Sequence, residues 1–469
     1  MSTAPAPSTQ ADRDTGQMVI MDPATGEQVG SLPIAGPEEA HRALAAARTA
    51  AADWAATSPA ERGQLLHRAA QALEDAAEEL AELNRRETGK PLQDSLGGVQ
   101  AGAATLRQYA ELGPVHRGHS LCGDQLATNY TVSEPRGVAL LLTPWNDPVA
   151  VAAGLIGAAL VTGNTVVHKP SERCPQVGAR LGELLEPIFA PGVFSTVLGD
   201  AATGRVLSEA GQAQVIAHVG SSATGARLAE VAAATSAHLI RENGGNDPLL
   251  VDAGVDPQWA AEQAALGCFA NAGQICTSVE RIYVHRDIAA EFCRALTEQA
   301  RQRNASGDFQ PLVDAAHREG VHEQVRQALA SGAVAAEGGM LPEGPGAHYP
   351  ATVLLQCASG MRVMDEETFG PIAPVEVVDD FEQGLAKARA GRYGLAASVL
   401  TADIAHLQQA VAGLPVGTVK VNAVFGGAPG GAAEPRGDSG AGFGYGPELL
   451  DEFTLTKVVH VSAPERRTP

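Results

Sequence analysis

The sequence has no long apolar run and a deficit of positive charge. Its longest apolar stretches are interrupted by Gly, Asn or a charged residue well short of a membrane span, so we expect no membrane helix. Thirty-three basic residues stand against 54 acidic ones, and the formal charge of -21 repels nucleic acid phosphates and anionic lipid surfaces. We therefore expect neither a nucleic acid nor a membrane as a partner.

Cysteine pairs and an N-terminal signal are also missing. The six cysteines form no CxxC motif, which is typical of a reduced cytoplasm and a poor match to a secreted disulfide framework. Residues 1–17 lack the positive start and the apolar stretch of a secretory signal, and they are rich in Ser, Thr, Ala and Pro. This composition predicts a disordered tail on a cytoplasmic protein.

The rest of the chain alternates between helical and strand-like patterns. A length of 469 residues exceeds one ordinary core, so two or three domains are expected. A capping box at residues 58–61 opens a periodic run that Gly89 closes, which predicts a long amphipathic helix. From Gly137 to residue 243, five short β-rich runs alternate with four helical windows. This order predicts a doubly wound parallel sheet, whose ligands bind at the carboxyl ends of its strands.

Further α/β and β patterns follow or flank this region. A second alternating set runs from PLLVDAG, which starts at residue 248, to about residue 445 and predicts a second α/β domain. Residues 122–135 alternate like an exposed hairpin, and TKVVHV near the C-terminus reads as another short strand. Strands of this kind often find partners on another subunit, so they favour an oligomer.

Four sets of polar residues lie at predicted strand ends, and each has two interpretations. Gly220 and Ser221 precede a helix and predict either a phosphate loop or a plain turn. Lys169 and Glu172 could reach a ribose or lie solvated at a helix entry. Asn146 offers a fixed amide donor for an oxyanion, although Asn is also ordinary in turns. Glu242 lies beside two glycines and is either functional or a solvated turn acid.

Cys276, in the stretch ANAGQICTSVERI, has four interpretations. Half of a disulfide is a minor possibility, since the composition fits a reduced compartment. A metal ligand is improbable, because the nearest cysteine, Cys268, is eight positions away and no His cluster accompanies it. A buried core thiol competes with a nucleophile, but the small and polar neighbours give a core thiol little to pack against.

The motifs together are more specific than any one of them. TPWNxP, KPSE, GSxxxG, ExGG, GQxC, EETFGP at 366–371 and PRGDSGAGFG, in this order, resemble the aldehyde dehydrogenase superfamily. Glu242 and Cys276 lie 34 positions apart, and Asn146 and Lys169 lie 23 apart, as that resemblance requires. The resemblance covers about residue 20 to about residue 460.

The resemblance implies a fold and an assembly. The fold is α/β, with a doubly wound, Rossmann-like NAD-binding domain at 18–116 and 136–246 and a second α/β catalytic domain at 247–447. A small β extension, formed by an oligomerisation hairpin at 117–135 and a C-terminal strand region at 448–469, completes it. The implied assembly is a homodimer or a homotetramer.

The resemblance also implies a reaction, the NAD-dependent oxidation of an aldehyde to a carboxylic acid. Cys276 attacks as a thiolate, Asn146 and the Cys276 backbone N–H hold the oxyanion, and Glu242 activates the water that hydrolyses the thioester. No metal is implied. The cofactor would be held by Trp145, Lys169, Glu172, Gly220, Ser221, Glu367 and Phe369. NAD is favoured over NADP because the Glu172 carboxylate would repel a 2′-phosphate.

Departures from the family pattern bear on the substrate. Asp147 and Asn243 stand where the family usually has apolar residues, and Asp147 either caps the helix that Pro148 starts or recruits a cationic amino aldehyde. We favour the cap. By resemblance Thr277 faces the aldehyde, and Ala150, Gly154 and Ala270 are smaller than the usual pocket residues. The substrate is expected to be larger or more polar than acetaldehyde: a semialdehyde, an amino aldehyde or a bulky or aromatic aldehyde.

Two other functions remain as alternatives. A catalytically silent member would serve as a binding or scaffold protein, although every inferred catalytic position holds a chemically competent residue. A thiol acyltransferase or amidase would leave the phosphate loop and the ribose pair unexplained. Binding of NAD separates that alternative from a dehydrogenase.

Overall fold

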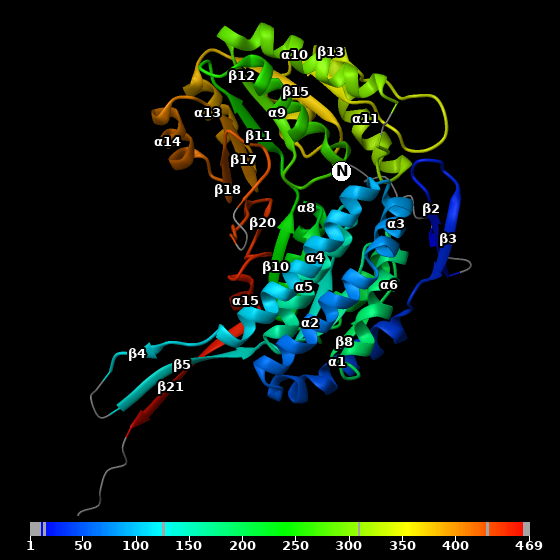
Figure 1. The fold of residues 1–469 in the computed structure, drawn as a ribbon, viewed down its shortest axis with the longest axis vertical. Helices are drawn as coiled ribbons and strands as arrows, with labels where there is room; N and C mark the ends of the chain where they lie inside the picture. Colours follow the sequence, from blue (N-terminus) through cyan, green and yellow to red (C-terminus); the bar gives the residue numbers. More distant parts are fainter. Residues whose placement is uncertain (1–10, 13–15, 124–126, 308–309, 428–430, 463–469) are drawn as a thin grey trace, which may run out of the picture.

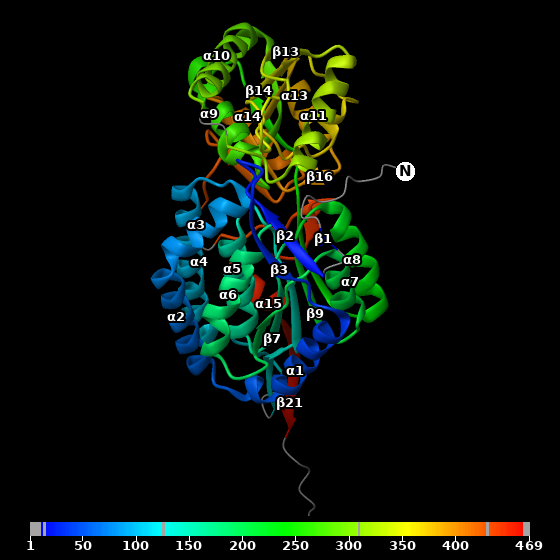
Figure 2. The same ribbon diagram turned by 90° about the vertical axis from the view of Figure 1, so that its right-hand side faces the viewer.

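The computed structural model has two lobes and a projecting β arm (Figure 1). It describes residues 11–12, 16–123, 127–307, 310–427 and 431–462. None of the helices in these ranges is both long enough and apolar enough to cross a membrane. In the view turned by 90°, the N-terminal sheet lies near the junction of the two lobes (Figure 2).

The first lobe is built on a six-stranded sheet in the order β20-β10-β9-β6-β7-β8. Its parallel strands confirm the five strands predicted after Gly137: β6 (Val138–Leu142), β7 (Thr165–Lys169), β8 (Phe194–Thr196), β9 (Val215–Gly220) and β10 (His238–Asn243). The sixth strand, β20 (Gly440–Ala441), pairs antiparallel with β10 and returns from the C-terminal segment. The predicted boundary at residue 447 is therefore too late, because the chain rejoins the first lobe at residue 440.

Helices cover both faces of this sheet. They are α1 (Pro37–Ala56), α2 (Pro59–Asp75), α3 (Ala77–Thr88), α4 (Leu92–Leu112), α5 (Pro148–Val161), α6 (Pro175–Leu185), α7 (Ala201–Glu209), α8 (Ser222–Thr235) and α15 (Leu449–Glu452). The predicted capping box is present, since the Glu61 N–H donates to the Ser58 hydroxyl over 3.2 Å. The predicted single helix is interrupted at Ala76, where φ of -105° and ψ of 14° leave the helical range.

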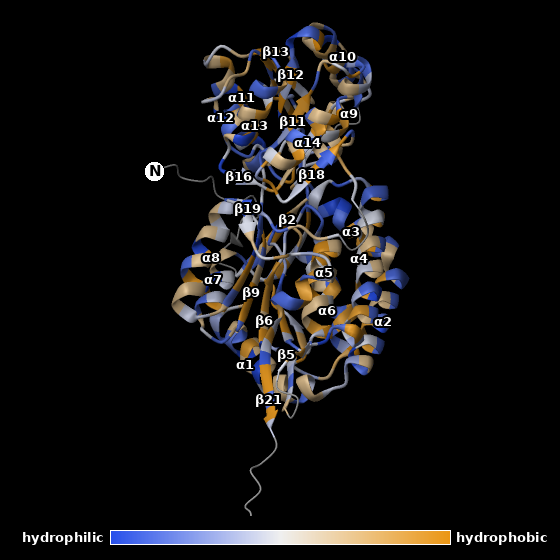
Figure 3. Ribbon diagram, turned by 90° about the vertical axis from the view of Figure 1, so that its left-hand side faces the viewer, coloured by the Kyte–Doolittle hydropathy of each residue, from blue (hydrophilic) through white to orange (hydrophobic). Residues whose placement is uncertain are grey.

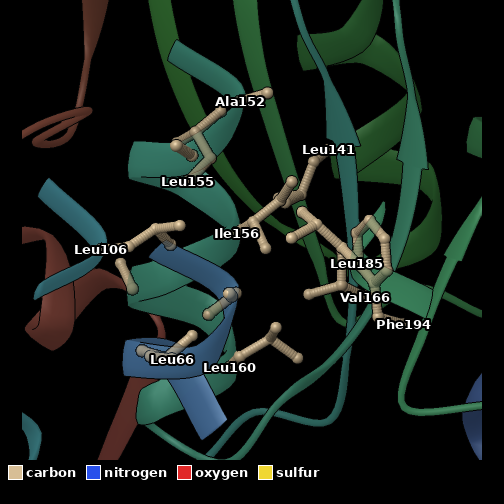
Figure 4. Close-up of a cluster of buried hydrophobic side chains, with 14 of the residues drawn as sticks. Leu66, Leu106, Leu141, Ala152, Leu155, Ile156, Leu160, Val166, Leu185 and Phe194 are labelled. Carbon is tan, nitrogen blue, oxygen red and sulfur yellow. The ribbon is translucent and has the colours of Figure 1, made fainter. Parts of the chain in front are cut away.

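The core of the first lobe lies between α5 and the sheet. Ile156 and Leu160 of α5 face Leu141 and Val166 of the strands, and Leu106 of α4 packs behind them (Figure 4). These side chains are essentially buried, and burial of each large apolar side chain contributes about 1.5–3 kcal/mol. Figure 3 shows the same arrangement: the strands of the sheet are mostly apolar, and the helices beside them carry both apolar and polar residues. This core fixes the strand ends that carry the predicted site residues.

The second lobe confirms the predicted second α/β domain. Its sheet has the order β13-β14-β15-β12-β11-β17-β18, with β13 antiparallel to β14 and the other pairs parallel. The strands are β11 (Asp247–Val251), β12 (Val279–His285), β13 (Val334–Glu337), β14 (Thr352–Leu355), β15 (Ile372–Val378), β17 (Ala396–Leu400) and β18 (Thr418–Val421). The helices are α9 (Pro257–Phe269), α10 (Arg286–Ala305), α11 (Ala315–Ala330), α12 (Arg362–Asp365), α13 (Phe381–Arg389) and α14 (Ile404–Gly413).

The projecting arm joins the two strand regions that were predicted to be exposed. β21 (Thr454–Ser462) pairs antiparallel with β5 (Ala127–Pro135), and β4 (Ser120–Leu121) pairs with the other edge of β5. The strands thus find partners within one chain, which the sequence did not indicate. Part of the predicted turn, residues 124–126, lies outside the described residues. Assembly into a dimer or tetramer stays a prediction.

The N-terminal sheet begins inside the segment predicted to be a tail. β1 (Ala11–Asp12) pairs antiparallel with β2 (Gln17–Met21), which pairs with β3 (Gln28–Pro33). Backbone pairing therefore starts before residue 18, while residues 1–10 and 13–15 of the predicted tail lie outside the described residues. A last short pair, β16 (Tyr393–Gly394) with β19 (Arg436–Gly437), precedes β20.

Candidate active site

Cys276, Asn146 and Glu242 come from three segments that meet where the lobes join. Asn146 follows β6, Glu242 lies in β10, and Cys276 lies between the 3₁₀ turn Ala270–Gly273 and β12. The Asn146 Nδ2 donates to the carbonyl of Gln274 over 3.1 Å, so the amide lies beside the cysteine loop. The Cys276 side chain is exposed. The fold therefore presents a reachable thiol next to an amide donor.

The loop before Cys276 is held by the Gln274 side chain. Its Nε2 donates to the Asn271 carbonyl over 3.1 Å, and its Oε1 accepts from the Val313 N–H over 2.9 Å. Asn271 and Ala272 have φ of 48° and 53°, left-handed values that non-glycine residues rarely adopt. The buried Gln274 side chain holds this strained backbone and so sets the position of Cys276. The motif GQxC is how this arrangement is recognised in the sequence.

Glu242 lies against the glycine-rich segment near the C-terminus. The Gly444 N–H donates to its carboxylate, and a Cβ at position 444 would come within 2.4 Å of its Cδ, so only glycine allows this approach. Burial raises the pKa of Glu242 to about 7, and the Gly444 N–H opposes part of that rise. At neutral pH this carboxyl is balanced between the acid and the base forms, as a general base requires.

The electrostatic setting of Cys276 is predominantly negative. Burial, together with the carboxylates of Glu242, Asp247 and Glu367, raises the pKa of the thiol to about 12, and Lys420 opposes them. Burial is the largest of these effects, and the acidic neighbours add to it. Among the described residues no group of three or more His, Cys, Asp or Glu side chains is placed to hold a metal ion.

A cavity of about 520 Å³ opens at the carboxyl ends of β6, β7 and β9. Lys169 and Glu172 line it and lie 3.4 Å apart, from Nζ to Oε2. Gly220 and Ser221 also line it, and the Ser221 hydroxyl accepts from the Thr224 N–H over 3.3 Å at the start of α8. The ion pair could bind the hydroxyls of a ribose, and the N-terminus of α8 attracts anions such as a phosphate. Together they fit an adenosine diphosphate, which is half of a dinucleotide.

Trp145 lies at the edge of this cavity and packs against the second lobe. Its ring lies 5.5 Å from that of Phe369 and 6.0 Å from that of His317, centroid to centroid. The Phe369 and Thr368 N–H groups donate to the buried Glu280 carboxylate over 2.7 and 2.9 Å. Sequence reasoning missed His317 and Glu280. Glu280 and Arg281 are adjacent charged residues in a strand that otherwise consists mainly of apolar residues, and this pair of charges is the signal that was available.

Glu367 and an ion pair between the lobes complete the surroundings of the cavity. The Glu367 carboxylate accepts from the Gly245 N–H and packs so closely on Gly244 that a Cβ there would lie 1.8 Å from its Oε1. Arg173 Nε of the first lobe lies 2.9 Å from Asp314 Oδ2 of the second, and its guanidinium lies 5.5 Å from the Trp145 ring centroid. This pair was not predictable from the sequence, because its members lie far apart in the chain.

Asp147 corrects the preferred interpretation of the sequence. It occupies the N-cap position of α5, but its side chain makes no capping hydrogen bond. Its Oδ1 instead lies 3.1 Å from Lys90 Nζ. A nearby ammonium attracts the carboxylate more strongly than a backbone N–H does, so this ion pair replaces the predicted cap. The pair also neutralises the charge that would recruit a cationic aldehyde.

The other predicted pocket residues lie around the same junction. Ala150 and Gly154 are half-buried on α5, where a Cβ at position 154 would meet only the Thr105 methyl, 3.9 Å away. Ala270 and Thr277, also half-buried, flank the cysteine loop. The unexpected Asn243 donates from Nδ2 to the Asp438 carbonyl over 2.9 Å and so holds the glycine-rich segment.

Comparisons with known proteins agree with this geometry. A betaine aldehyde dehydrogenase of Rhizobium leguminosarum bv. trifolii is 33% identical over 474 residues, covering 97% of this chain and 96% of its own. One from Cereibacter sphaeroides is 35% identical, covering 96% and 94%. The solved betaine aldehyde dehydrogenase of Staphylococcus aureus in complex with NAD+ superposes with a TM-score of 0.93 at 28% identity, covering 97% and 93%. The family model for the aldehyde dehydrogenase family matches residues 10–459, and the chain belongs to this family.

Proposed function

We propose that this protein oxidises an aldehyde to a carboxylic acid with NAD, through covalent intermediates on Cys276. The observation that carries the proposal is the convergence of Cys276, Asn146 and Glu242 beside a cavity that fits a dinucleotide. Each group has the chemistry that one step needs: a nucleophile, an oxyanion donor and a base with a pKa raised to about 7.

The reaction begins when the Cys276 thiolate attacks the aldehyde carbon and forms a thiohemiacetal. The negative oxygen accepts hydrogen bonds from the Asn146 side chain and the Cys276 backbone N–H. A nicotinamide held by Glu367 and Phe369 would supply the acceptor for the hydride that leaves this carbon. Glu242 then takes a proton from water, which attacks the thioester on Cys276 and releases the carboxylic acid and the thiol.

The cofactor is proposed to bind along the strand ends of the first lobe. Lys169 and Glu172 would hold the adenosine ribose, Gly220 and Ser221 the pyrophosphate, and Trp145 the wall of the cleft. Glu367 and Phe369 would hold the nicotinamide half. NAD is favoured over NADP because the Glu172 carboxylate opposes a 2′-phosphate, and the solved Staphylococcus aureus relative binds NAD+.

The substrate is proposed to be an aldehyde larger than acetaldehyde. Small residues at 150, 154 and 270 leave room in the pocket. The names of the relatives favour an amino aldehyde such as betaine aldehyde. Two features weigh against a quaternary ammonium group: Asp147 is paired with Lys90, and no pocket position predicted here is aromatic, while aromatic faces usually bind such cations. We therefore favour a bulky aldehyde or semialdehyde.

A substrate panel with both cofactors tests this proposal. Aliphatic, aromatic, amino and semialdehyde substrates, with betaine aldehyde among them, are followed at the NADH absorbance with NAD and NADP in parallel. We expect NAD-dependent turnover without coenzyme A, and higher kcat/KM for bulky aldehydes than for acetaldehyde. Cofactor binding without turnover of any aldehyde would favour a silent binding protein, and hydrolysis or acyl transfer without cofactor binding would favour an amidase or acyltransferase.

The arm is proposed to join copies of this chain into a homodimer or a homotetramer. Leu121, Leu455, Val458 and Val461 are exposed on it, and exposed apolar side chains on a three-stranded sheet favour association. Sedimentation of the full chain measures the assembly. A cytoplasmic location is expected from the cysteine usage.

Asn146→Ala is predicted to lower kcat by roughly 10²- to 10³-fold, the usual effect of removing one oxyanion donor. NAD affinity is expected to stay within about threefold, because the amide does not line the cofactor cavity. Steady-state kinetics and NAD titration measure the two effects. An unchanged kcat would contradict the assigned role.

Gly154→Phe is predicted to lower kcat/KM for bulky aldehydes roughly tenfold or more, because the ring occupies space that is open at this position. Activity with acetaldehyde is expected to persist. Gly154→Ala is the matched control and should change neither value by more than about threefold, since a methyl group meets only the Thr105 methyl. Equal losses of kcat/KM for large and small aldehydes would contradict the assignment of Gly154 to the substrate pocket.

A further inference from the structure

Lys420 is a half-buried lysine on β18 whose charge the reaction scheme does not use. It pairs in register with Ser398 of β17, and Ser398 pairs in register with Leu249 of β11. Asp247 lies two positions before Leu249, so it projects from the same face of the sheet. The strand register therefore directs the ammonium of Lys420 and the carboxylate of Asp247 to one side, at the end of the sheet that faces Cys276.

Asp247 is buried directly beside the cysteine loop. A Cβ on Gly245 would lie 2.5 Å from the Asp247 Oδ1 and 3.1 Å from the Cys276 carbonyl oxygen, so both groups border the same glycine. Oδ1 accepts from the Ala396 N–H over 3.2 Å, and Oδ2 has no hydrogen-bond partner among the described residues. Burial raises the pKa of this carboxyl, which is 4% exposed, so its ionised form depends on a positive charge nearby.

Lys420 is the cation in position to supply that charge. Its Nζ lies 5.6 Å from the centroid of the Phe425 ring, which holds the side chain against the lobe. No carboxylate of the described residues forms an ion pair with it within 4.0 Å, so its charge is not taken up by one close partner. Burial lowers the pKa of Lys420, and negative charge on Asp247 or on Cys276 opposes that lowering.

The thiol faces three carboxylates from three elements: Glu242 of β10, Asp247 of β11 and Glu367 before β15. Each of them disfavours a negative sulfur, and a nucleophilic cysteine without a positioned histidine needs a compensating charge. We propose that Lys420 is a positioning residue whose ammonium stabilises the Cys276 thiolate, and that Asp247 holds this ammonium in place. The inference rests on the proposed function, in which the thiolate is the attacking species.

No proton transfer between Lys420 and Cys276 is part of this proposal. The thiol proton leaves to solvent, and Lys420 keeps its proton throughout. The lysine therefore acts through the field it places on the sulfur. Loss of that field predicts a change in the pH dependence of the thiol, whereas a purely structural role predicts a change in folding with the pH dependence left in place.

The rate at which iodoacetamide alkylates Cys276 tests the inference directly. Peptide mass spectrometry follows that one residue at several pH values in the wild-type chain, Lys420→Met, Lys420→Gln and Lys420→Arg. In the Met and Gln variants we expect the pH–rate profile to move up by about one unit, a roughly tenfold slower alkylation at any pH below the thiol pKa. Lys420→Arg, which keeps the charge, should restore most of the rate.

Lys457→Met is the matched control, because Lys457 is an exposed lysine on the arm, paired with Glu134 and distant from the lobes' junction (Figure 1). Its profile should overlay that of the wild type. Profiles of Lys420→Met and Lys420→Gln that also overlay the wild type, in protein that melts normally, would overturn the inference. The proposed function fails by a different result: full NADH production after complete alkylation of Cys276.

Discussion

Cys276→Ser is expected to lower NADH formation by roughly 10⁴-fold or more, with NAD binding retained. A serine hydroxyl is a far weaker nucleophile than a thiol, and Glu242, with a pKa of about 7, is too weak a base to ionise it in this acidic setting. The cofactor cavity lies at the ends of β6, β7 and β9, and Cys276 does not line it. Stopped-flow absorbance and NAD titration measure the two expectations.

Cys122→Ser is the control for this substitution, since Cys122 is also exposed but does not lie in the cysteine loop. It should retain wild-type activity. Full turnover by the Cys276→Ser variant would contradict covalent catalysis through Cys276. Loss of NAD binding in the same variant would indicate a folding defect. Equal losses in both serine variants would point to general damage from handling the thiols.

The fold was predictable because its strands and helices carry local signals. The parallel strands of the first sheet other than β10 are short, mostly apolar runs, and Pro148, Pro175 and Ser58 mark helix starts by their own chemistry. The carboxyl ends of parallel strands share one edge, so the polar residues that follow them could be placed together without coordinates. Asn146 and Lys169 were found in this way.

The parts that could not be predicted depend on contacts between distant segments. The Lys90–Asp147 pair joins the connection between α3 and α4 to the N-cap position of α5, and the capping preference of Asp indicated the wrong partner. β20 has only two residues, too few for a periodic signal, yet its pairing with β10 brings Gly444 onto Glu242. The arm is a similar case, since strand patterns do not specify which strands pair.

Glu242→Gln is expected to separate the two halves of the reaction. Acylation of Cys276 does not need the carboxylate, so about one equivalent of NADH per active site should form rapidly. Hydrolysis of the thioester then lacks its base, and steady turnover should fall by roughly 10²- to 10⁴-fold. Rapid mixing of enzyme, NAD and aldehyde resolves the burst from the steady phase, and acid quenching with mass spectrometry detects the acyl group on Cys276.

The pH dependence supplies the control for this variant. The base form of Glu242 is the ionised carboxylate, and burial raises its pKa to about 7, so the wild-type hydrolysis rate should rise from about pH 6 to about pH 8 and then level off. Glutamine does not titrate, and the residual rate in Glu242→Gln should lack that rise. Absence of the burst in Glu242→Gln would assign Glu242 to acylation instead, because a base needed to ionise Cys276 would limit the first half of the reaction and leave no thioester to accumulate. A titration near pH 7 that persists in this variant would show that another group is the base.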